Sequence, residues 1–221
     1  MNPLPKLQVD NYIEYWESLY NREFFFGSGP TKLAKYAEAI LTKSNVKKIL
    51  EVGCGQGRDA LHFAQLGYDV DAFDISRNAI KSIKNQKEKL HLDNLNVITQ
   101  DCSKKFVFEK KQFDFVYSNL ALQFFELESL DTIFKEISRV LKNDSLVLFS
   151  TKKEGDKYYN FGEKIGEYSF KNKGIIRYFF PRKILENTLS SYFDVIQFES
   201  DKHVNLDTSV SVWWKILLKN K

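Results

Sequence analysis

The chain combines an acid with a glycine-rich turn at a spacing that suits the binding of a small organic molecule. An apolar run over residues 48–52 contains one acid, Glu51. Three glycines follow at alternate positions, Gly53, Gly55 and Gly57. Glycine permits a sharp bend and a close ligand approach because it lacks a Cβ atom. The amides that begin the next helix have no intrahelical acceptor and can bind a polar ligand. The stretch therefore predicts strand, tight turn and helix around a bound molecule.

Polar residues recur where three later strands are expected to end. Asp74 and Asp101 each follow an apolar, β-branched run, and Asn119 follows a third. In an open α/β sheet, ligands bind beyond the carboxyl ends of the strands. Carboxylates gathered there repel one another unless a ligand with hydroxyls, amines or positive charge lies among them. Each acid alone could instead cap the next helix, but their common position favours a cofactor site.

Two classes of cofactor fit this pattern. Asp74 follows the first glycine by about 20 residues, where a carboxylate can accept hydrogen bonds from ribose hydroxyls. Gly55, Gly57 and Ala60 satisfy the GxGxxA form of the nicotinamide dinucleotide fingerprint. However, Glu51 has no use beside a pyrophosphate, whereas it could bind an ammonium group. These features favour S-adenosylmethionine and leave an NAD-binding oxidoreductase as an alternative.

Apolar periodicity predicts the elements that position these residues. Strands are expected over 47–52, 69–74, 95–100, 113–118, 145–151, 193–199 and 209–218, and helices over 10–23, 30–43, 57–66, 76–90, 120–125, 128–142 and 181–190. The alternation of strand and helix predicts a parallel sheet covered on both faces. The last two strands have no helix between them and must pair antiparallel. We expect a doubly wound, seven-stranded, Rossmann-like α/β sheet, mostly parallel with an antiparallel C-terminal hairpin strand.

The chain is expected to form one domain, 1–221, with two additions to the sheet. Residues 1–45 predict an N-terminal helical cap with an aromatic loop, 24–26. Residues 152–180 predict a lid-like insertion, because 153–174 is polar, glycine-dotted and longer than an ordinary connection; a disordered excursion is the alternative. Trp213 and Trp214 must face opposite ways on the last strand, so one is expected in the core and the other in a partner or dimer contact.

Composition indicates a globular protein and gives little support to a membrane or nucleic-acid partner. Hydrophobic residues make up 43% of the chain, and the net charge is only +4. No apolar run approaches the roughly 18 residues that span a bilayer, and the first ten residues lack a signal-peptide core. We expect a cytoplasmic monomer or homodimer. Cys54 and Cys102 are expected to be free thiols, and no Cys/His cluster indicates a metal site.

Four ordered motifs resemble the cofactor domain of class I S-adenosylmethionine-dependent methyltransferases. They lie at 51–57, 73–76, 100–102 and 113–123. The resemblance implies that the cofactor is held by Glu51, Gly53, Cys54, Gly55, Gly57, Asp74, Ile75, Asp101, Cys102 and Asn119. Glu51 and the glycines would hold the methionine portion, Asp74 the ribose, and Ile75, Asp101 and the Cys102 amide the adenine. The Asn119 carbonyl would help to bind the ammonium group. The turn at 141–144, Leu-Lys-Asn-Asp, departs from the usual LKPGG.

The flanking segments are similar to small bacterial methyltransferases of the tellurite-resistance and thiopurine type. Trp16, Tyr20, 26–27, 160–162 and 177–180 carry this similarity. In that group the N-terminal segment and the segment after the fifth strand close over the cofactor. The stretch from Ser118 to Gln123 also resembles the malonyl-carrier-protein methyltransferases of biotin synthesis.

The methyl acceptor is expected to be a small molecule in an aromatic pocket. Methyl transfer is an in-line displacement that depends on alignment and exclusion of water, so we expect no catalytic base. His62 and His91 are expected to be surface or helix residues, and His203 to be solvated near the hairpin turn. Clustered rings predict a pocket built from Tyr20, Phe26, Tyr158 and Tyr178, with Arg177 as an anion-binding side chain.

Two other functions remain open from the sequence. The basic, aromatic stretch 171–183 could bind RNA or DNA, which would make the protein a nucleic-acid methyltransferase. Against this, an NPPY-like tetrad is absent after the fourth strand, where Ser118 to Ala121 stand instead. The second alternative is a protein that binds the cofactor without transferring its methyl group.

Overall fold

The computed structural model describes residues 6–22, 25–205 and 207–221; Phe24 of the expected aromatic loop lies outside them. The helices are α1 (Lys6–Leu19), α2 (Lys32–Leu41), α3 (Arg58–Gln65), α4 (Arg77–Lys89), α5 (Leu127–Val140) and α6 (Arg182–Leu189), with a 3-10 helix, η1 (Leu122–Phe124). The strands are β1 (Lys48–Val52), β2 (Asp69–Asp74), β3 (Leu95–Thr99), β4 (Phe113–Asn119), β5 (Leu141–Lys152), β6 (Glu163–Gly166), β7 (Ser169–Asn172), β8 (Ile175–Tyr178), β9 (Phe193–Val204) and β10 (Val210–Asn220).

Seven strands form the main sheet in the order β3-β2-β1-β4-β5-β10-β9. β1 pairs parallel with both β2 and β4, so the order of the strands reverses beside β1. β10 runs antiparallel to both of its neighbours, β5 and β9. The expected doubly wound, mostly parallel sheet with an antiparallel hairpin strand is therefore confirmed. Its switch point lies between β1 and β4, where ligands bind in folds of this type.

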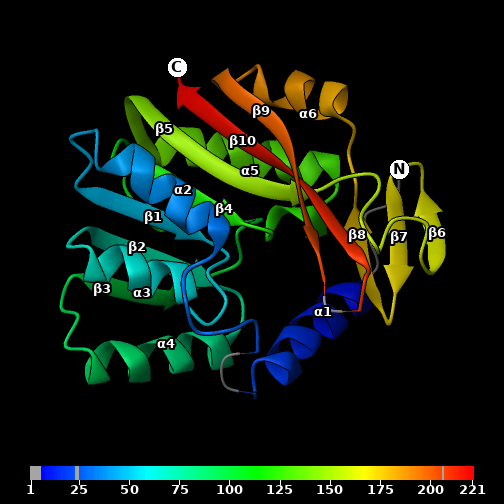
Figure 1. Cartoon of the computed structure of the whole chain (residues 1–221), viewed down its shortest axis with the longest axis horizontal. Coiled ribbons are helices and arrows are strands. Elements are labelled where there is room, and N and C mark those ends of the chain that lie inside the picture. Colours follow the sequence, from blue (N-terminus) through cyan, green and yellow to red (C-terminus); the bar gives the residue numbers. More distant parts are fainter. Residues whose placement is uncertain (1–5, 23–24, 206) are drawn as a thin grey trace.

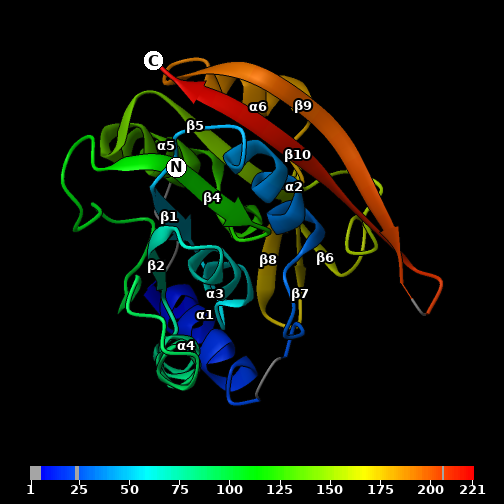
Figure 2. The same cartoon turned by 60° about the vertical axis from the view of Figure 1, so that its left-hand side comes forward.

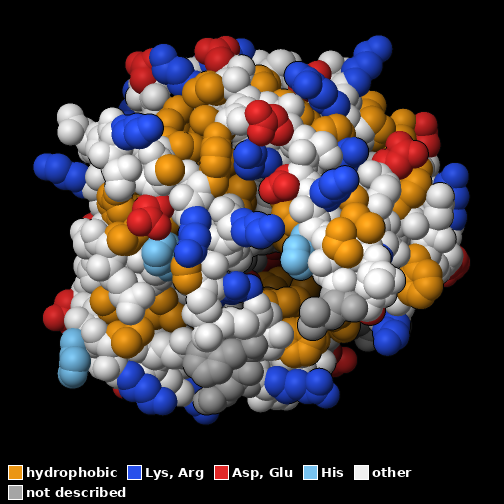
Figure 3. Space-filling model, in the orientation of Figure 1, with side chains coloured by type: hydrophobic (Ala, Val, Ile, Leu, Met, Phe, Trp, Pro, Cys, Tyr) orange, Lys and Arg blue, Asp and Glu red, His pale blue; other side chains and the backbone are white. Residues whose placement is uncertain are grey.

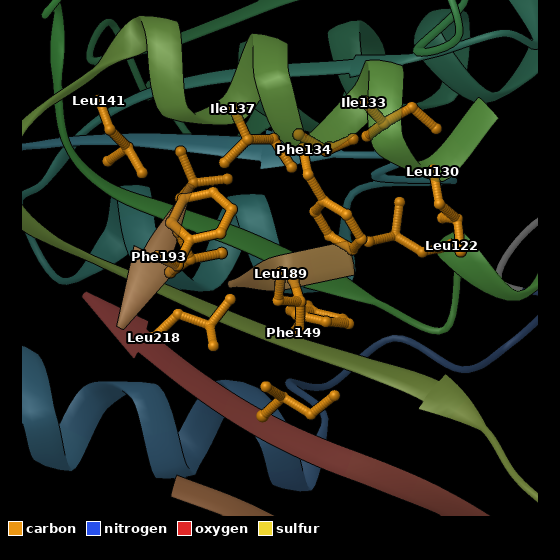
Figure 4. Close-up of a cluster of buried hydrophobic side chains, with 14 of the residues drawn as sticks. Leu122, Leu130, Ile133, Phe134, Ile137, Leu141, Phe149, Leu189, Phe193 and Leu218 are labelled. Atoms are coloured by element: carbon orange, nitrogen blue, oxygen red, sulfur yellow. The ribbon is translucent and has the colours of Figure 1, made fainter. Parts of the chain in front are cut away.

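Helices cover both faces of this sheet (Figure 1). On one face, α2, α3 and α4 bury apolar side chains against the centre of the sheet. On the other face, α5 and α6 pack against β5, β9 and β10, and Figure 4 shows the contact: Ile133, Phe134 and Ile137 of α5 lie over Phe149 and Leu218 of the sheet. Both packed faces hold the carboxyl ends of the strands in fixed positions.

The expected lid-like stretch is an ordered three-stranded antiparallel sheet, β6-β7-β8. It follows β5, and β8 contacts η1. The far ends of β9 and β10 project well past the rest of the main sheet (Figure 2). The alternative of a disordered excursion over 153–174 is not what the structure shows. Its strands have only four residues each, and β6 is largely exposed whereas β7 and β8 are buried or half-buried, so no strand is long enough to show a clear apolar periodicity.

Helix α1 lies across the carboxyl edge of the sheet because Glu17 binds the first turn of α4. The Glu17 carboxylate accepts hydrogen bonds from the amides of Arg77 (2.9 Å) and Asn78 (3.0 Å) and from the Ser76 hydroxyl (2.9 Å). The unpaired amides and positive dipole end of a helix favour such an anion. The helix ends at Leu19, earlier than expected, and its position brings Trp16 and Tyr20 against the carboxyl edge.

Candidate functional site

One cavity of about 920 Å³ opens at the carboxyl ends of β1 to β5, beside the switch point. α1, the loop before α2, η1, β8 and β10 complete its walls. Figure 3 shows it as a hollow near the middle of one face, with hydrophobic side chains inside and Lys, Arg and His side chains along its upper rim. The volume lies at the upper end of the roughly 300–1,000 Å³ usual for small-molecule sites. It therefore has the size needed for a two-substrate reaction.

A buried acid without a partner lies at one end of the cavity. Glu51, at the end of β1, is 3% exposed, and its Oε2 atom has no hydrogen-bond partner among the described residues. Burial raises the pKa of this carboxyl well above its usual range, and the nearby charges of Asp59 and Asp74 raise it further. A buried carboxylate of this kind is costly unless a cation or a donor pairs with it. Glu51 is thus suited to a positively charged ligand.

Asp74 lies at the end of β2, and its carboxylate is held by a backbone amide of the glycine turn. Its Oδ2 atom accepts the Gly55 amide (2.8 Å) and its Oδ1 atom the Ser76 amide (3.0 Å). Burial raises the pKa of Asp74, and these two hydrogen bonds oppose the rise. Each carboxylate oxygen has two lone pairs, so the pair of oxygens keeps acceptor capacity for ligand hydroxyls.

The three glycines of the turn have different surroundings. A Cβ on Gly53 (φ +70°) would lie 2.4 Å from the Ala121 Cβ, and one on Gly55 (φ +52°) 2.8 Å from the Tyr20 hydroxyl. Both glycines line the cavity. Gly57 does not: a Cβ there would lie 2.6 Å from Cγ1 of Ile83, so this glycine lets α3 approach α4. The structure therefore does not bring Gly57 to the cavity, contrary to its expected place.

The remaining expected cofactor residues line the same end of the cavity: Cys54, Ile75, Asp101, Cys102 and Asn119. The Asp101 Oδ1 atom accepts the Ser103 amide (2.8 Å). The Asn119 Oδ1 atom accepts the Ser150 hydroxyl (2.7 Å), which fixes the end of β4. Burial raises the pKa of both cysteine thiols, which are free as expected.

Two side chains of the glycine turn bind the loop before α2, which the sequence analysis missed. Gln56 accepts the Phe25 amide (2.9 Å) and donates to the Arg22 carbonyl (2.8 Å). The Arg58 guanidinium donates to the carbonyls of Gly29 (2.6 Å) and Phe26. We call these contacts the Gln56–Arg58 clamp. Long polar side chains inside a glycine motif were the available signal, but their partners are loop carbonyls that no sequence pattern marks.

A second missed residue is Asp59, which is 2% exposed and lies on α3. Its carboxylate accepts the Thr31 amide (2.7 Å), the Thr31 hydroxyl (2.8 Å) and the Tyr117 hydroxyl (2.7 Å). Thr31 also caps α2 by accepting the Ala34 amide. Because α2, α3 and β4 all meet at Asp59, its negative charge is held close to Glu51 and strengthens the acidic character of this end.

Aromatic rings from α1 and η1 cover the middle of the cavity. The rings of Trp16 and Phe124 meet edge-to-face with centroids 4.9 Å apart, and Trp16 stacks on Tyr20 at 5.8 Å. Tyr12 packs against both Trp16 and Phe124. Phe26, an expected acceptor residue, is 53% exposed at the mouth. These rings give the cavity an apolar, flat-sided interior.

The end of the cavity away from Glu51 is cationic. Lys152, Lys157 and Arg177 line it, and so does Tyr158. The Lys152 ammonium forms a buried ion pair with Asp156 (2.5 Å). Burial lowers the pKa of Lys152, Asp156 raises it, and the charges of Lys157 and Arg177 lower it again. The cations are thus close enough to repel one another.

One expectation about aromatic residues needs correction at this end, and another is confirmed. Tyr178 does not line the cavity; it stacks on Phe180 with centroids 5.5 Å apart, on the other side of β8 from Arg177. Trp214 packs against Phe198 in the core, as one tryptophan was expected to do. Trp213 lines the cavity.

The histidines and the basic stretch have separate surroundings. His62 binds the Glu38 carboxylate (3.0 Å), whereas the exposed His203 lies at the cavity mouth. In the stretch 171–183, Phe179 and Phe180 are buried, so its rings and cations do not form one open surface. Among residues 6–22, 25–205 and 207–221, no group of acidic, His or Cys side chains could hold a metal ion, and no helix is long and apolar enough to cross a membrane.

Comparison with known proteins defines the class. Residues 49–144 match the family model for a methyltransferase domain. The 1,6-didemethyltoxoflavin-N1-methyltransferase of Burkholderia thailandensis, solved with S-adenosylhomocysteine, superposes with a TM-score of 0.76 at 15% identity, covering 100% of this chain and 92% of that one. At this identity the superposition shows the shared fold. The matched region is a class I S-adenosylmethionine-dependent methyltransferase domain, whose cofactor is S-adenosylmethionine, as the motifs predicted.

The particular relatives are bacterial methyltransferases that the chain matches over part of their length. Ninety residues are 34% identical to the probable S-adenosyl-L-methionine-dependent methyltransferase TehB of Haemophilus influenzae, covering 41% of this chain and 30% of TehB. A malonyl-[acyl-carrier protein] O-methyltransferase of Buchnera aphidicola is 33% identical over 113 residues, covering 50% of this chain and 41% of that protein. The chain thus spans less than half of either relative in these matches.

Proposed function

We propose that the whole chain is an enzyme that transfers a methyl group from S-adenosylmethionine to a small-molecule acceptor. The observation that carries the proposal is the cavity at the switch point, which is acidic at one end and aromatic and cationic at the other. The cofactor is a cation, and the orphaned Oε2 atom of Glu51 lies in the acidic end. The residues present therefore fit the cofactor that the domain class requires.

The acidic end is proposed to hold the cofactor as follows. Glu51, Gly53, Cys54, Gly55 and the Asn119 carbonyl bind the methionine portion. Asp74 accepts hydrogen bonds from the ribose hydroxyls with the lone pairs that Gly55 and Ser76 leave open. Ile75 packs on the adenine. Asp101 accepts a hydrogen bond from the adenine amino group, and the Cys102 amide donates one to a ring nitrogen. All of these residues except Ser76 line the cavity.

The chain is proposed to contribute alignment and exclusion of water. When bound, S-adenosylmethionine supplies an electrophilic methyl group on a sulfonium. Trp16, Tyr20, Phe26 and Tyr158 provide apolar walls that orient the acceptor, and α1 with β6–β8 acts as cap and lid over the reacting atoms. In-line displacement with good alignment needs no dedicated base, provided that the acceptor is already a good nucleophile.

The proposal is tested by calorimetric titration of the purified chain with S-adenosylhomocysteine and with NAD, followed by transfer of radiolabelled methyl groups to panels of thiols, carboxylates, phenols and transfer RNA. We expect S-adenosylhomocysteine to bind and NAD not to bind. Labelling of a small molecule supports the proposal. Labelling of transfer RNA alone would replace it with the nucleic-acid alternative, and binding without transfer to any panel would leave a cofactor-binding protein.

Asp74→Asn provides the matched test at the site. The substitution removes the charge that is proposed to accept the ribose hydroxyls, and we expect affinity for S-adenosylhomocysteine to fall at least about tenfold. Asp69→Asn, at the opposite end of β2, is the control because Asp69 is exposed and outside the cavity. Equal affinities for the two variants would contradict the assignment of Asp74.

A further inference from the structure

Arg177 of β8 is a charged side chain whose described surroundings contain two rings but no acceptor. Its guanidinium lies 4.5 Å from the centroid of Tyr158 and 5.6 Å from that of Phe124. Among the described residues, no carboxylate or carbonyl accepts a hydrogen bond from it, and none forms an ion pair with it. A guanidinium carries five N–H donors in a planar array that matches a carboxylate or another planar oxyanion. The donors of Arg177 therefore point to a ligand.

The charged side chains around Arg177 also favour a negatively charged ligand. Lys152 and Lys157 line the cavity with Arg177, and Lys152 is close enough to both of the other cations for their charges to interact. Lys157 also lies over the Tyr158 ring, 5.5 Å from its centroid. Asp156 neutralises Lys152, but its own oxygens are taken up: Oδ2 accepts the Val212 amide (2.8 Å) and Oδ1 the Tyr158 amide (3.0 Å). Among the described residues, two cations at this end have no ion-pair partner: Arg177 and Lys157.

Acidic groups nearby offset only part of this excess. Asp201 lines the cavity, and its Oδ1 atom accepts the backbone amide of Lys202 (2.8 Å), so the carboxylate keeps its charge and offsets one of the two cations. Lys215, another lining cation, is paired with Glu199 (3.1 Å). The charge not matched by an ion pair at this end is hence positive, and it stands opposite the acids Glu51 and Asp74.

We propose that the methyl acceptor is a flat, aromatic anion, with its carboxylate or equivalent oxyanion bound by Arg177 and its ring lying against Tyr158 and Phe124. This inference rests on the proposed function and specifies its substrate class. The geometry gives each part of the acceptor a place: the planar guanidinium binds the planar anion, and the two rings that flank it extend the stacking surface. The opposite signs of the two ends also fix orientation, because a cationic cofactor and an anionic acceptor are each repelled from the wrong end.

The test is calorimetric titration of the chain saturated with S-adenosylhomocysteine, using benzoate and 1-naphthoate as aromatic anions. The matched uncharged probes are benzamide and 1-naphthamide, and acetate is the anion without a ring. We expect the aromatic carboxylates to bind at least about tenfold more tightly than their amides or acetate.

Substitutions at Arg177 separate charge from shape. Arg177→Gln should weaken binding of the aromatic carboxylates at least about tenfold and leave the affinity for the amides unchanged. The carboxylate affinity of Arg177→Lys should lie between those of Arg177→Gln and the unaltered chain, because lysine keeps the charge but not the planar donors. Arg182→Gln is the matched control: Arg182 is paired with Glu186 (2.7 Å) and lies outside the cavity. Arg182→Gln should bind the aromatic carboxylates with the same affinity as the unaltered chain.

The outcomes distinguish this inference from the proposed function. If S-adenosylhomocysteine binds but the carboxylates bind no better than the amides, or if Arg177→Gln has no effect, the anionic acceptor is ruled out and the methyltransferase proposal stands. If S-adenosylhomocysteine itself does not bind, the proposed function fails first. Unchanged affinity of Arg177→Gln for S-adenosylhomocysteine shows that the variant is folded and that its effect lies at the acceptor end.

Discussion

Burial controls the protonation of Glu51, the residue that gives the acidic end of the cavity its character. Its pKa is raised by burial and by the facing carboxylates of Asp59 and Asp74. In the ligand-free chain the proton is therefore retained to a higher pH than in an exposed glutamate. A cation bound beside it would stabilise the carboxylate and lower the pKa again. Glu51 thus couples the binding of a cationic ligand to the release of a proton.

Binding of S-adenosylmethionine should release this proton at pH values between the ordinary glutamate pKa of 4.5 and the raised pKa of Glu51. The affinity should rise with pH from the ordinary glutamate value toward the raised pKa, because deprotonating Glu51 first costs free energy below that pKa. Calorimetry at pH 6 in two buffers of different ionisation enthalpy measures the proton. Glu51→Gln should abolish the release, whereas Asp69→Asn should not; equal heats in both buffers for the unaltered chain would refute the coupling. Because the pKa of Asp74 is also raised, the Glu51→Gln variant identifies the source.

At the scale of elements, the cavity depends on how α1 and β10 are attached to the sheet. α1 is held by one carboxylate, Glu17, at the start of α4. The β5–β10 wall is held by the buried pair of Lys152 and Asp156 together with the bond from the Val212 amide. Both attachments are charged groups that satisfy backbone amides, so removing either leaves unpaired donors.

Glu17→Gln should loosen α1 and cost about 1–2 kcal/mol of stability, a typical value for lost helix caps. Burial alone would raise the pKa of Glu17, but hydrogen bonds from Asn78, Arg77 and Ser76 lower it. The carboxylate therefore stabilises the fold fully at pH values above 4.5, the ordinary pKa of glutamate. This contribution is lost as the pH falls through the lowered pKa of Glu17. Urea denaturation at pH 7 and pH 3 measures both effects. Glu14→Gln, an exposed change on the same helix, is the control, and an equal loss in both variants would contradict the cap.

Asp156→Asn should be more damaging, by about 3–5 kcal/mol, because it leaves the buried Lys152 charge without its partner. Adding Lys152→Met should recover part of the loss, since the orphaned charge is then removed as well. Denaturation of the two single variants and the double variant gives the coupling energy. Glu154→Gln, exposed and two residues away, should be neutral. Additive losses would mean that the two side chains do not stabilise each other.

At the scale of the whole molecule, ligand binding should reduce motion at both sides of the cavity. If α1 and β6–β8 act as cap and lid, S-adenosylhomocysteine should slow amide hydrogen exchange in 12–22 and 157–178, in addition to the glycine turn. Exchange in α5, on the far face of the sheet, should change little and serves as the internal control. Protection confined to the glycine turn would show that the cap and lid do not respond to the cofactor.

The main sheet could be predicted because its strands are buried and alternate with amphipathic helices. Glu51, Asp74 and Asp101 could then be placed at one edge because each follows the end of a parallel strand, whereas the order of the strands was not predicted and comes from the structure. Local sequence sufficed for these features because each is set by residues close in the chain.

The remainder depends on contacts between distant segments. The Gln56–Arg58 clamp and Glu17 bind backbone groups, which any residue supplies, so the sequence does not mark them. The error at Tyr178 has a different cause: neighbouring residues of a strand face opposite ways, so Arg177 and Tyr178 cannot both line one cavity. That rule applies only once β8 is known to be a strand, and a segment of four residues is too short to give that signal.

The two ends of the cavity come from separate stretches of the chain. Glu51 to Cys102 supply the acids, whereas Lys152 to Trp213 supply the cations and their flanking tryptophan. On the proposed assignment, a chimaera that receives 152–180 from another protein of this fold would keep the acids of the cofactor end and exchange the cations that select the acceptor. Trp16, Tyr20, Phe26 and Phe124 lie outside this stretch, so laboratory evolution toward a new acceptor would have to vary these rings as well.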